Sequence, residues 1–89
     1  TDIENAILAV EHGADNIRVN AIAPGLIQTN FARALWEDEE ILGRATSRAP
    51  LKRIGQPDEI AGAAIMMASK AGTFLTGQTL VIDGGQTIA

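Results

Sequence analysis

The chain has 89 residues, 46% of them hydrophobic and 20% charged, with a formal net charge of −4. This length holds one core at most, and the composition is typical of a folded protein and excludes extended disorder. The absence of cysteine excludes disulfides and thiolate metal sites, and the negative charge argues against nucleic acid as a partner. Since no apolar run can span a bilayer and no secretory leader is visible, we expect a cytoplasmic protein without a membrane partner.

The first predicted element is an amphipathic helix over residues 2–12. Its apolar residues recur at helical spacing: Ile3, Ala6, Ile7 and Val10. Gly13 is expected to end the helix as its left-handed cap, and His12 is expected to lie near the negative end of the helix dipole. A lone histidine forms no recognised metal site with acids alone, so no metal ligand is predicted.

A strand is predicted over residues 17–23, ended by the Pro24-Gly25 turn. Its branched apolar residues do not alternate with polar ones, which is typical of a parallel strand covered on both faces. Residues 26–48 then change to a mixed helical pattern, from which we expect one or two short helices.

The second half of the chain predicts a helix and a strand. Residues 55–59 combine a first-turn proline with acidic side chains, so a helix should begin there and continue to about Lys70, closed by Lys70 and Gly72. A strand over residues 78–82 follows and turns away at residues 83–85. Strand, helix and strand in this order indicate a right-handed crossover in a parallel sheet, hence an α/β fold. Because two strands are too few for a stable sheet, further strands are expected from an N-terminal half or from other chains.

Motifs that mark a catalytic centre are absent from the sequence. Neither a glycine-rich nucleotide-binding pattern nor a G-x-S-x-G nucleophile turn occurs, and there is no tyrosine, so no catalytic residue is predicted here. A strand that ends in Pro24-Gly25, with Thr29 shortly after, still brings backbone groups and a hydroxyl to the carboxyl edge of a parallel sheet, where open α/β folds bind ligands. On spacing alone, a purely structural turn is the more frequent explanation, and both stay open.

Three segments in order resemble motifs of the short-chain dehydrogenase/reductase family. Residues 16–29 are similar to its N-I-R-V-N-x-I-x-P-G-x-I-x-T, residues 50–61 to its P-x-x-R-x-G-x-P-x-E-I-A, and residues 76–85 to its closing T-G-Q-x-x-x-x-D-G-G. Together they span nearly the whole chain. The resemblance implies that residues 1–89 are the C-terminal segment of a single Rossmann-type domain with a doubly wound parallel sheet, following the family's Tyr-x-x-x-Lys motif.

The resemblance also implies a cofactor, NAD or NADP, and the residues that bind it. Pro24 and Gly25 would shape the turn beside the nicotinamide ring, and the backbone of Ile27 would meet the carboxamide. The Thr29 hydroxyl would bind the carboxamide or the nearby phosphate. Such contacts suit an amide, which offers both a donor and an acceptor to a fixed backbone edge.

Residues 26–49 match the region that forms the variable substrate lid in this family. Phe31, Leu35 and Trp36 would belong to that lid, which excludes water and orders the substrate when it closes. The alternative, that these three side chains only pack a helix against the body, is equally open.

Two further groups match family positions and are expected to be structural. Arg53 needs acceptors, and Glu59 lies in a first helical turn, where an acid meets the helix dipole. Residues 83–85 are expected to make the turn after the last strand; a contact with substrate or with a neighbouring subunit is the alternative.

For the whole protein, the resemblance implies an oxidoreductase that transfers a hydride between the nicotinamide and a small alcohol or ketone. The catalytic Ser, Tyr and Lys and the glycine-rich cofactor loop would precede the residues matched here, so the 89 residues alone are predicted to be inactive. A homodimer or homotetramer is expected. The main alternative is a non-catalytic binding or oligomerisation module derived from the same fold; a free-standing small α/β domain conflicts with two strands that are covered on both faces.

Overall fold

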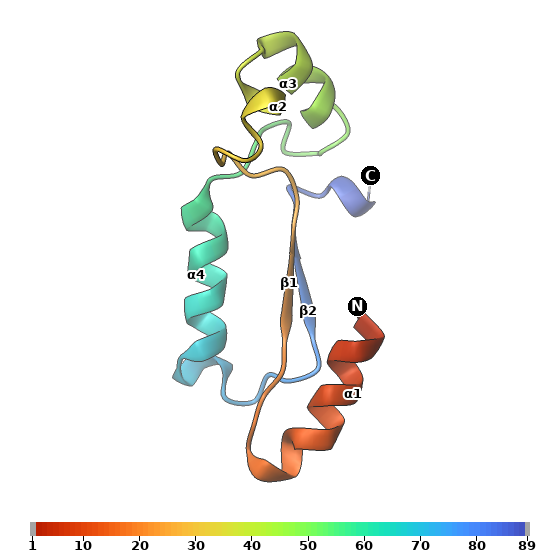
Figure 1. The fold of residues 1–89 in the computed structure, drawn as a ribbon, viewed down its shortest axis with the longest axis vertical. Coiled ribbons are helices and arrows are strands. Elements are labelled where there is room, and N and C mark those ends of the chain that lie inside the picture. Colours follow the sequence, from red (N-terminus) through yellow and green to blue (C-terminus); the bar gives the residue numbers. More distant parts are fainter. Residues whose placement is uncertain (1, 89) are drawn as a thin grey trace. The chain divides into compact units, whose positions relative to one another are not determined.

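The structure is a computed structural model that describes residues 2–88. Its helices and strands follow one another as α1 (Asp2–His12), β1 (Ala21–Pro24), α2 (Arg33–Trp36), α3 (Glu39–Thr46), α4 (Pro57–Ala68) and β2 (Thr79–Ile82) (Figure 1). Short 3₁₀ turns lie at Gly13–Asp15, Lys70–Gly72 and Gln86–Ile88. The chain divides into two compact units: Thr1–Ala23 with Ala61–Leu80, and Pro24–Ile60 with Val81–Ala89. None of the described helices is long and apolar enough to cross a bilayer.

Helix α1 has the predicted bounds, but the prediction that Gly13 is its left-handed cap is wrong. The chain continues from His12 through a 3₁₀ turn, and Asn16 is the residue with positive φ, at 60°. The Asn16 N–H donates to the Gly13 carbonyl at 3.0 Å, and the Ile17 N–H donates to the His12 carbonyl at 3.2 Å. Asparagine tolerates the left-handed conformation better than other residues with a side chain, so the chain changes direction at Asn16.

Strands β1 and β2 form a parallel pair, as predicted. The Ala21 N–H donates to the Gln78 carbonyl and the Gly25 N–H to the Ile82 carbonyl, each at 2.9 Å, so the residue numbers rise together along both strands. Strand β1 begins at Ala21, four residues later than expected, because backbone pairing needs a partner strand and β2 begins only at Thr79.

Before β1, hydrogen bonds from polar side chains take the place of backbone pairing between the two strands. The Asn20 amide spans the loop ahead of β2: its Nδ2 donates to the Leu75 carbonyl at 2.8 Å, and its Oδ1 accepts from the Gln78 N–H at 3.1 Å. Arg18 Nη1 also donates to the Leu75 carbonyl, at 3.3 Å. The polar residues of the first family-like motif therefore hold two segments of the chain together.

Helix α1 is tied to the beginning of β2 within the first unit. Asn5 Nδ2 donates to the Gln78 carbonyl at 3.0 Å, and the Thr79 hydroxyl donates to Asp2 Oδ1 at 2.7 Å. Asn5 is 7% exposed, and its buried Oδ1 meets no hydrogen-bond donor among residues 2–88. A buried acceptor of this kind destabilises a fold by about 1–3 kcal/mol unless it finds a donor.

Helix α4 begins at Pro57 as expected and ends at Ala68, two residues before Lys70. Ser69 causes the early end: its hydroxyl accepts from the Ala71 N–H at 3.2 Å and caps the 3₁₀ turn that contains Lys70 and Gly72. Serine competes with the helix for backbone donors, which a periodicity argument does not register.

The core of the described residues is small. Ala9 and Ala49 are its buried hydrophobic residues, and no large side chain is fully buried. Within the described residues, the positions of β1 and β2 are half-buried or exposed, so the covering of both faces stays a prediction for a larger sheet. The sheet has two strands within the described part of the chain, fewer than a stable sheet usually has. Large apolar side chains remain in contact with water, among them Ile3, Val10 and Phe74.

Candidate functional site

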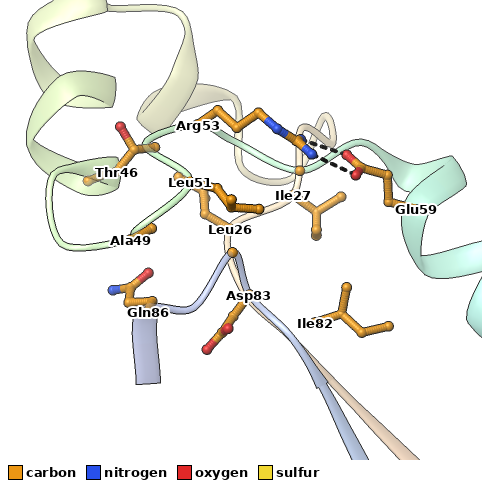
Figure 2. A pocket seen from close by; sticks show the side chains of 13 residues that line it. Leu26, Ile27, Thr46, Ala49, Leu51, Arg53, Glu59, Ile82, Asp83 and Gln86 are labelled. Atoms are coloured by element: carbon orange, nitrogen blue, oxygen red, sulfur yellow. Dashed lines mark hydrogen bonds and ion pairs between the residues drawn. The ribbon is translucent and has the colours of Figure 1, made fainter. Parts of the chain in front are cut away.

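A cavity of about 90 Å³ lies in the second unit, where β1 and β2 end (Figure 2). It is lined by Leu26 and Ile27 from the loop after β1, by residues between 45 and 59, and by the turn after β2. The carboxyl ends of parallel strands are the usual ligand-binding edge of an open α/β sheet. The sequence predicted a binding loop at this edge, and the loop forms one wall of the cavity.

Gly25 allows the loop after β1 to lie against the end of β2. A β-carbon at this position would be 2.7 Å from both Cα and Cβ of Asp83, well inside van der Waals contact. Gly25 does not have a positive φ, so the glycine is needed for space and not for backbone freedom. The predicted Pro24-Gly25 turn is therefore a close approach between two strand ends.

Ile27 is held by an isolated parallel bridge to Gly55. The Gly55 N–H donates to the Leu26 carbonyl and the Gln28 N–H donates to the Gly55 carbonyl, each at 2.9 Å. In a parallel bridge, the residue between the two bonded groups turns its own N–H and carbonyl away from the partner. The Ile27 carbonyl accepts from the Thr29 N–H at 2.9 Å, while the Ile27 N–H meets no acceptor within residues 2–88.

Thr29 organises the start of the segment predicted as a lid. Its hydroxyl oxygen accepts from the Ala32 N–H at 3.3 Å, and its carbonyl accepts from Trp36 Nε1 at 2.8 Å. A hydroxyl that accepts one bond still has its own proton to donate. Thr29 is exposed, so this proton can reach a ligand.

The three predicted lid residues lie in different surroundings. Phe31 precedes α2 and is completely exposed, and Leu35 is 44% exposed. Trp36 is half-buried and is fixed by its indole hydrogen bond to the Thr29 carbonyl. The structure thus attaches Trp36 to the loop after β1 and leaves Phe31 and Leu35 facing solvent.

Arg53 and Glu59 form a bidentate ion pair at the beginning of α4, with two nitrogen–oxygen distances of 2.8 Å (Figure 2). Glu59 Oε1 also accepts from the Gln56 N–H at 3.0 Å, which is half of a capping box. The pKa of the Glu59 carboxyl falls from 4.5 to about 2, first because Arg53 donates to it and then because the Gln56 N–H does. The sequence assigned structural roles to both residues but missed that they pair with each other.

The Glu59 pair predicts a specific dependence of stability on pH. Because the folded pKa lies below the ordinary one, the contribution of the pair is complete above pH 4.5 and is lost as the pH falls toward about 2. Glu59→Gln should therefore lower the urea midpoint of the full-length protein at neutral pH and flatten its decline across that acid range. Asp58→Asn, which removes a carboxylate from the same helical turn without touching the pair, is the matched control. Parallel acid profiles of Glu59→Gln and the unmodified protein would contradict the assignment.

Asp83 anchors the predicted turn at residues 83–85, where Gly84 and Gly85 have φ values of 66° and 90°. Its Oδ1 accepts from the Gly85 N–H and its Oδ2 from the Thr87 N–H, each at 2.9 Å. Partial burial raises the pKa of the Asp83 carboxyl, but the hydrogen bonds from Thr87 and its neighbours outweigh this effect and hold the pKa below its ordinary value. Both carboxylate oxygens are thus engaged in shaping the chain.

A metal site is not formed by the described residues, since they contain no cluster of three or more His, Cys, Asp or Glu side chains that could hold an ion. The structure does reveal one contact that the sequence analysis missed. Gly55 lies against Ile27, and Gln56 Nε2 donates to Gln28 Oε1 at 3.2 Å beside it. The glycine within the second family-like motif indicated a close contact, but the neighbouring residues do not indicate which part of the chain it contacts.

Residues 6–87 match a family model described as enoyl-(acyl carrier protein) reductase. Dehydrogenase/reductase SDR family member 4 from Oryctolagus cuniculus is 44% identical over 78 residues, which cover 88% of this chain and 30% of that protein.

Solved structures of dehydrogenases are also similar to this chain. A structure from Agrobacterium tumefaciens described as a 2-deoxy-D-gluconate 3-dehydrogenase, with bound NADP, matches with a TM-score of 0.92 and 39% identity, covering 99% of this chain and 36% of that one. A 4-hydroxyisoleucine dehydrogenase complexed with NADH matches with a TM-score of 0.94 and 32% identity, with the same coverage. The chain thus spans about a third of the length of these relatives. The predicted fold class, part of a Rossmann-type α/β sheet, is confirmed. The chain belongs to the short-chain dehydrogenase/reductase family.

Proposed function

We propose that these 89 residues are part of an NAD(P)-dependent oxidoreductase and supply its nicotinamide-side loop and its substrate lid. The observation that carries the proposal is the open Ile27 N–H at the carboxyl end of β1, two residues before an exposed Thr29 hydroxyl. When bound, a nicotinamide cofactor supplies or accepts a hydride at a small alcohol or ketone. NADP and NADH are the cofactors named for two of the similar structures.

The donors of the loop fit a carboxamide. Its carbonyl oxygen can accept from the Ile27 N–H, and the Thr29 hydroxyl can bind the same group or a neighbouring phosphate. Pro24 and Gly25 set the direction in which the loop leaves the sheet, so they fix the position of these donors. The chemical role of the segment is to hold the ring in one orientation, and such positioning lowers a barrier substantially.

The lid of the proposed enzyme is the segment 26–49, which contains α2 and α3. These two helices contact each other, and Trp36 links α2 to Thr29. Phe31 and Leu35 are exposed and free to cover an apolar part of a substrate. A covered site excludes water from the reacting carbon.

A longer chain is part of the same proposal. The described core consists of small side chains, and Asn5 Oδ1 needs a donor that residues 2–88 do not provide. We infer that preceding sequence supplies further strands of the sheet together with the catalytic Ser, Tyr and Lys and the cofactor's glycine-rich loop. A cytoplasmic homodimer or homotetramer is the assembly we expect.

The test uses the full-length protein and the Thr29→Val variant, which keeps the shape of the side chain and removes its hydroxyl. Loss of one hydrogen bond, about 1–1.5 kcal/mol, should weaken the binding of NADH or NADPH about tenfold in a fluorescence titration. Thr29→Ser should restore the affinity. Thr73→Val is the matched control, because that exposed hydroxyl only donates to the Lys70 carbonyl.

Binding of neither cofactor by the full-length protein, or no hydride transfer to any of a panel of ketones and alcohols, would refute the proposal. The alternative function is a non-catalytic oligomerisation module. It is favoured by the exposed apolar side chains of α1, where Ile3 is 73% and Val10 is 83% exposed. A stable oligomer that binds no nicotinamide cofactor would establish that alternative.

A further inference from the structure

We propose that Gly55 is a positioning residue for the nicotinamide: it fixes the Ile27 backbone so that the Ile27 N–H points toward the cofactor and away from the protein. This inference rests on the proposed function and extends it to a residue outside the binding loop. Gly55 lies 28 positions further along the chain, just before α4.

Backbone hydrogen bonds join Gly55 to the loop around Ile27. Gly55 uses its N–H and its carbonyl to bind the Leu26 carbonyl and the Gln28 N–H, each at 2.9 Å. These two bonds fix both peptide planes that flank Ile27, and with them the direction of its N–H. The side-chain bond from Gln56 to Gln28, at 3.2 Å, joins the same two segments a second time.

The space around Gly55 is limited on the side of Ile27. A β-carbon at Gly55 would lie 2.7 Å from Ile27 Cδ1, and the next atom, the Leu26 carbonyl oxygen, is 3.6 Å away. Gly55 does not have a positive φ, so alanine can adopt its backbone conformation. The crowding at Gly55 therefore comes from one contact, with the tip of the Ile27 side chain.

An ion pair and a helix cap hold the segment around Gly55 in place. Arg53 and Glu59 bracket it with their bidentate ion pair, and the Gln56 N–H binds Glu59 at 3.0 Å. Gly55 is thus attached to the capped end of a helix of 12 residues. A β-carbon added there meets the Ile27 side chain from the end of that helix.

These contacts make a selective prediction. Gly55→Ala should displace Ile27 and redirect its N–H, which weakens the bond to the carboxamide. The adenosine end of the cofactor does not meet this loop in the proposed arrangement, so ADP-ribose, which lacks the nicotinamide, should bind the variant as it binds the unmodified protein.

The experiment measures, on the full-length protein, the dissociation constants of NADH, NADPH and ADP-ribose, the KM and kcat with the preferred cofactor, and the melting temperature. Gly55→Ala is expected to weaken binding of the preferred cofactor about tenfold, equivalent to about 1.4 kcal/mol, with the loss in KM more than in kcat. Adding Ile27→Val removes the clashing Cδ1, so the double variant should recover most of the affinity. Gly62→Ala in α4, where an added β-carbon meets nothing within 4 Å, is the matched control.

Three results would overturn the inference: unchanged cofactor affinity in Gly55→Ala, an equal loss of ADP-ribose binding, or no recovery in the double variant. Should Gly55→Ala fail to fold, the double variant decides, because a steric cause requires it to fold and to bind the cofactor. Binding of neither NADH nor NADPH by the unmodified protein would refute the proposed function, and the inference with it. That outcome is distinct from the other three, which need a protein that binds the cofactor.

Discussion

Gly25→Ala is expected to destabilise the full-length protein by about 1–3 kcal/mol, the usual cost of forcing extra volume into a packed site, and to abolish most of its cofactor binding. The added β-carbon would lie 2.7 Å from Cα and Cβ of Asp83. These atoms cannot move easily, because the Asp83 carboxylate binds the Gly85 and Thr87 N–H groups and the adjacent Ile82 carbonyl accepts from Gly25 itself.

Urea denaturation and a cofactor titration measure the two effects. Gly62→Ala is the matched control: nothing lies within 4 Å of its new β-carbon, and it should stabilise the helix by about 0.5–1 kcal/mol. A second substitution that shortens the Asp83 side chain should not rescue Gly25→Ala, because the clash with Cα persists. A Gly25→Ala protein with full stability would show that the two strand ends can separate at no cost.

The 89-residue chain alone is expected to show no hydride transfer and no cooperative thermal unfolding. Its accessible surface is 6460 Å², whereas a folded monomer of this mass exposes about 5,000 Å². The excess, roughly 1,500 Å², is about twice the roughly 800 Å² that each partner buries in a standard protein–protein interface. Surface of this extent needs a partner that residues 2–88 do not provide.

Two measurements check this prediction: nicotinamide absorbance during turnover, and calorimetry of the isolated chain beside the full-length protein. The full-length protein should unfold with a heat-absorption peak that the isolated chain lacks. Turnover by the isolated chain would contradict the absence of a catalytic residue. A sharp, concentration-independent transition would instead support the alternative of a free-standing small α/β domain.

Elements with strong local signals were predictable from the sequence. Helix α1 has the predicted bounds because its apolar spacing repeats over three turns, and α4 begins at Pro57 because proline and Glu59 both favour a first turn. The turn at residues 83–85 followed from its glycines. In each case the determining interactions lie within a few residues of one another.

Features set by distant contacts were not predictable. Strand β1 begins at Ala21 because its partner strand β2 begins at Thr79. The residues around Ile17 do not indicate where that partner strand begins. In the site, the resemblance pointed to Ile27 and Thr29, but the contact between Gly55 and Ile27 joins residues far apart in the chain. The cofactor and lid roles of Pro24, Gly25, Ile27, Thr29, Phe31, Leu35 and Trp36 stay predictions.

The ion pair that caps α4 faces water, with 51% of the Arg53 side chain and 41% of the Glu59 side chain exposed. Dissolved ions screen such a pair strongly, since the Debye length falls to about 3 Å at 1 M ionic strength. The hydrogen bonds between Gly55 and the loop at Ile27 join neutral peptide groups and respond far less to ions. At high salt concentration the ion pair at the N-terminal end of α4 would therefore weaken, while the hydrogen-bonded loop at Ile27 kept its conformation.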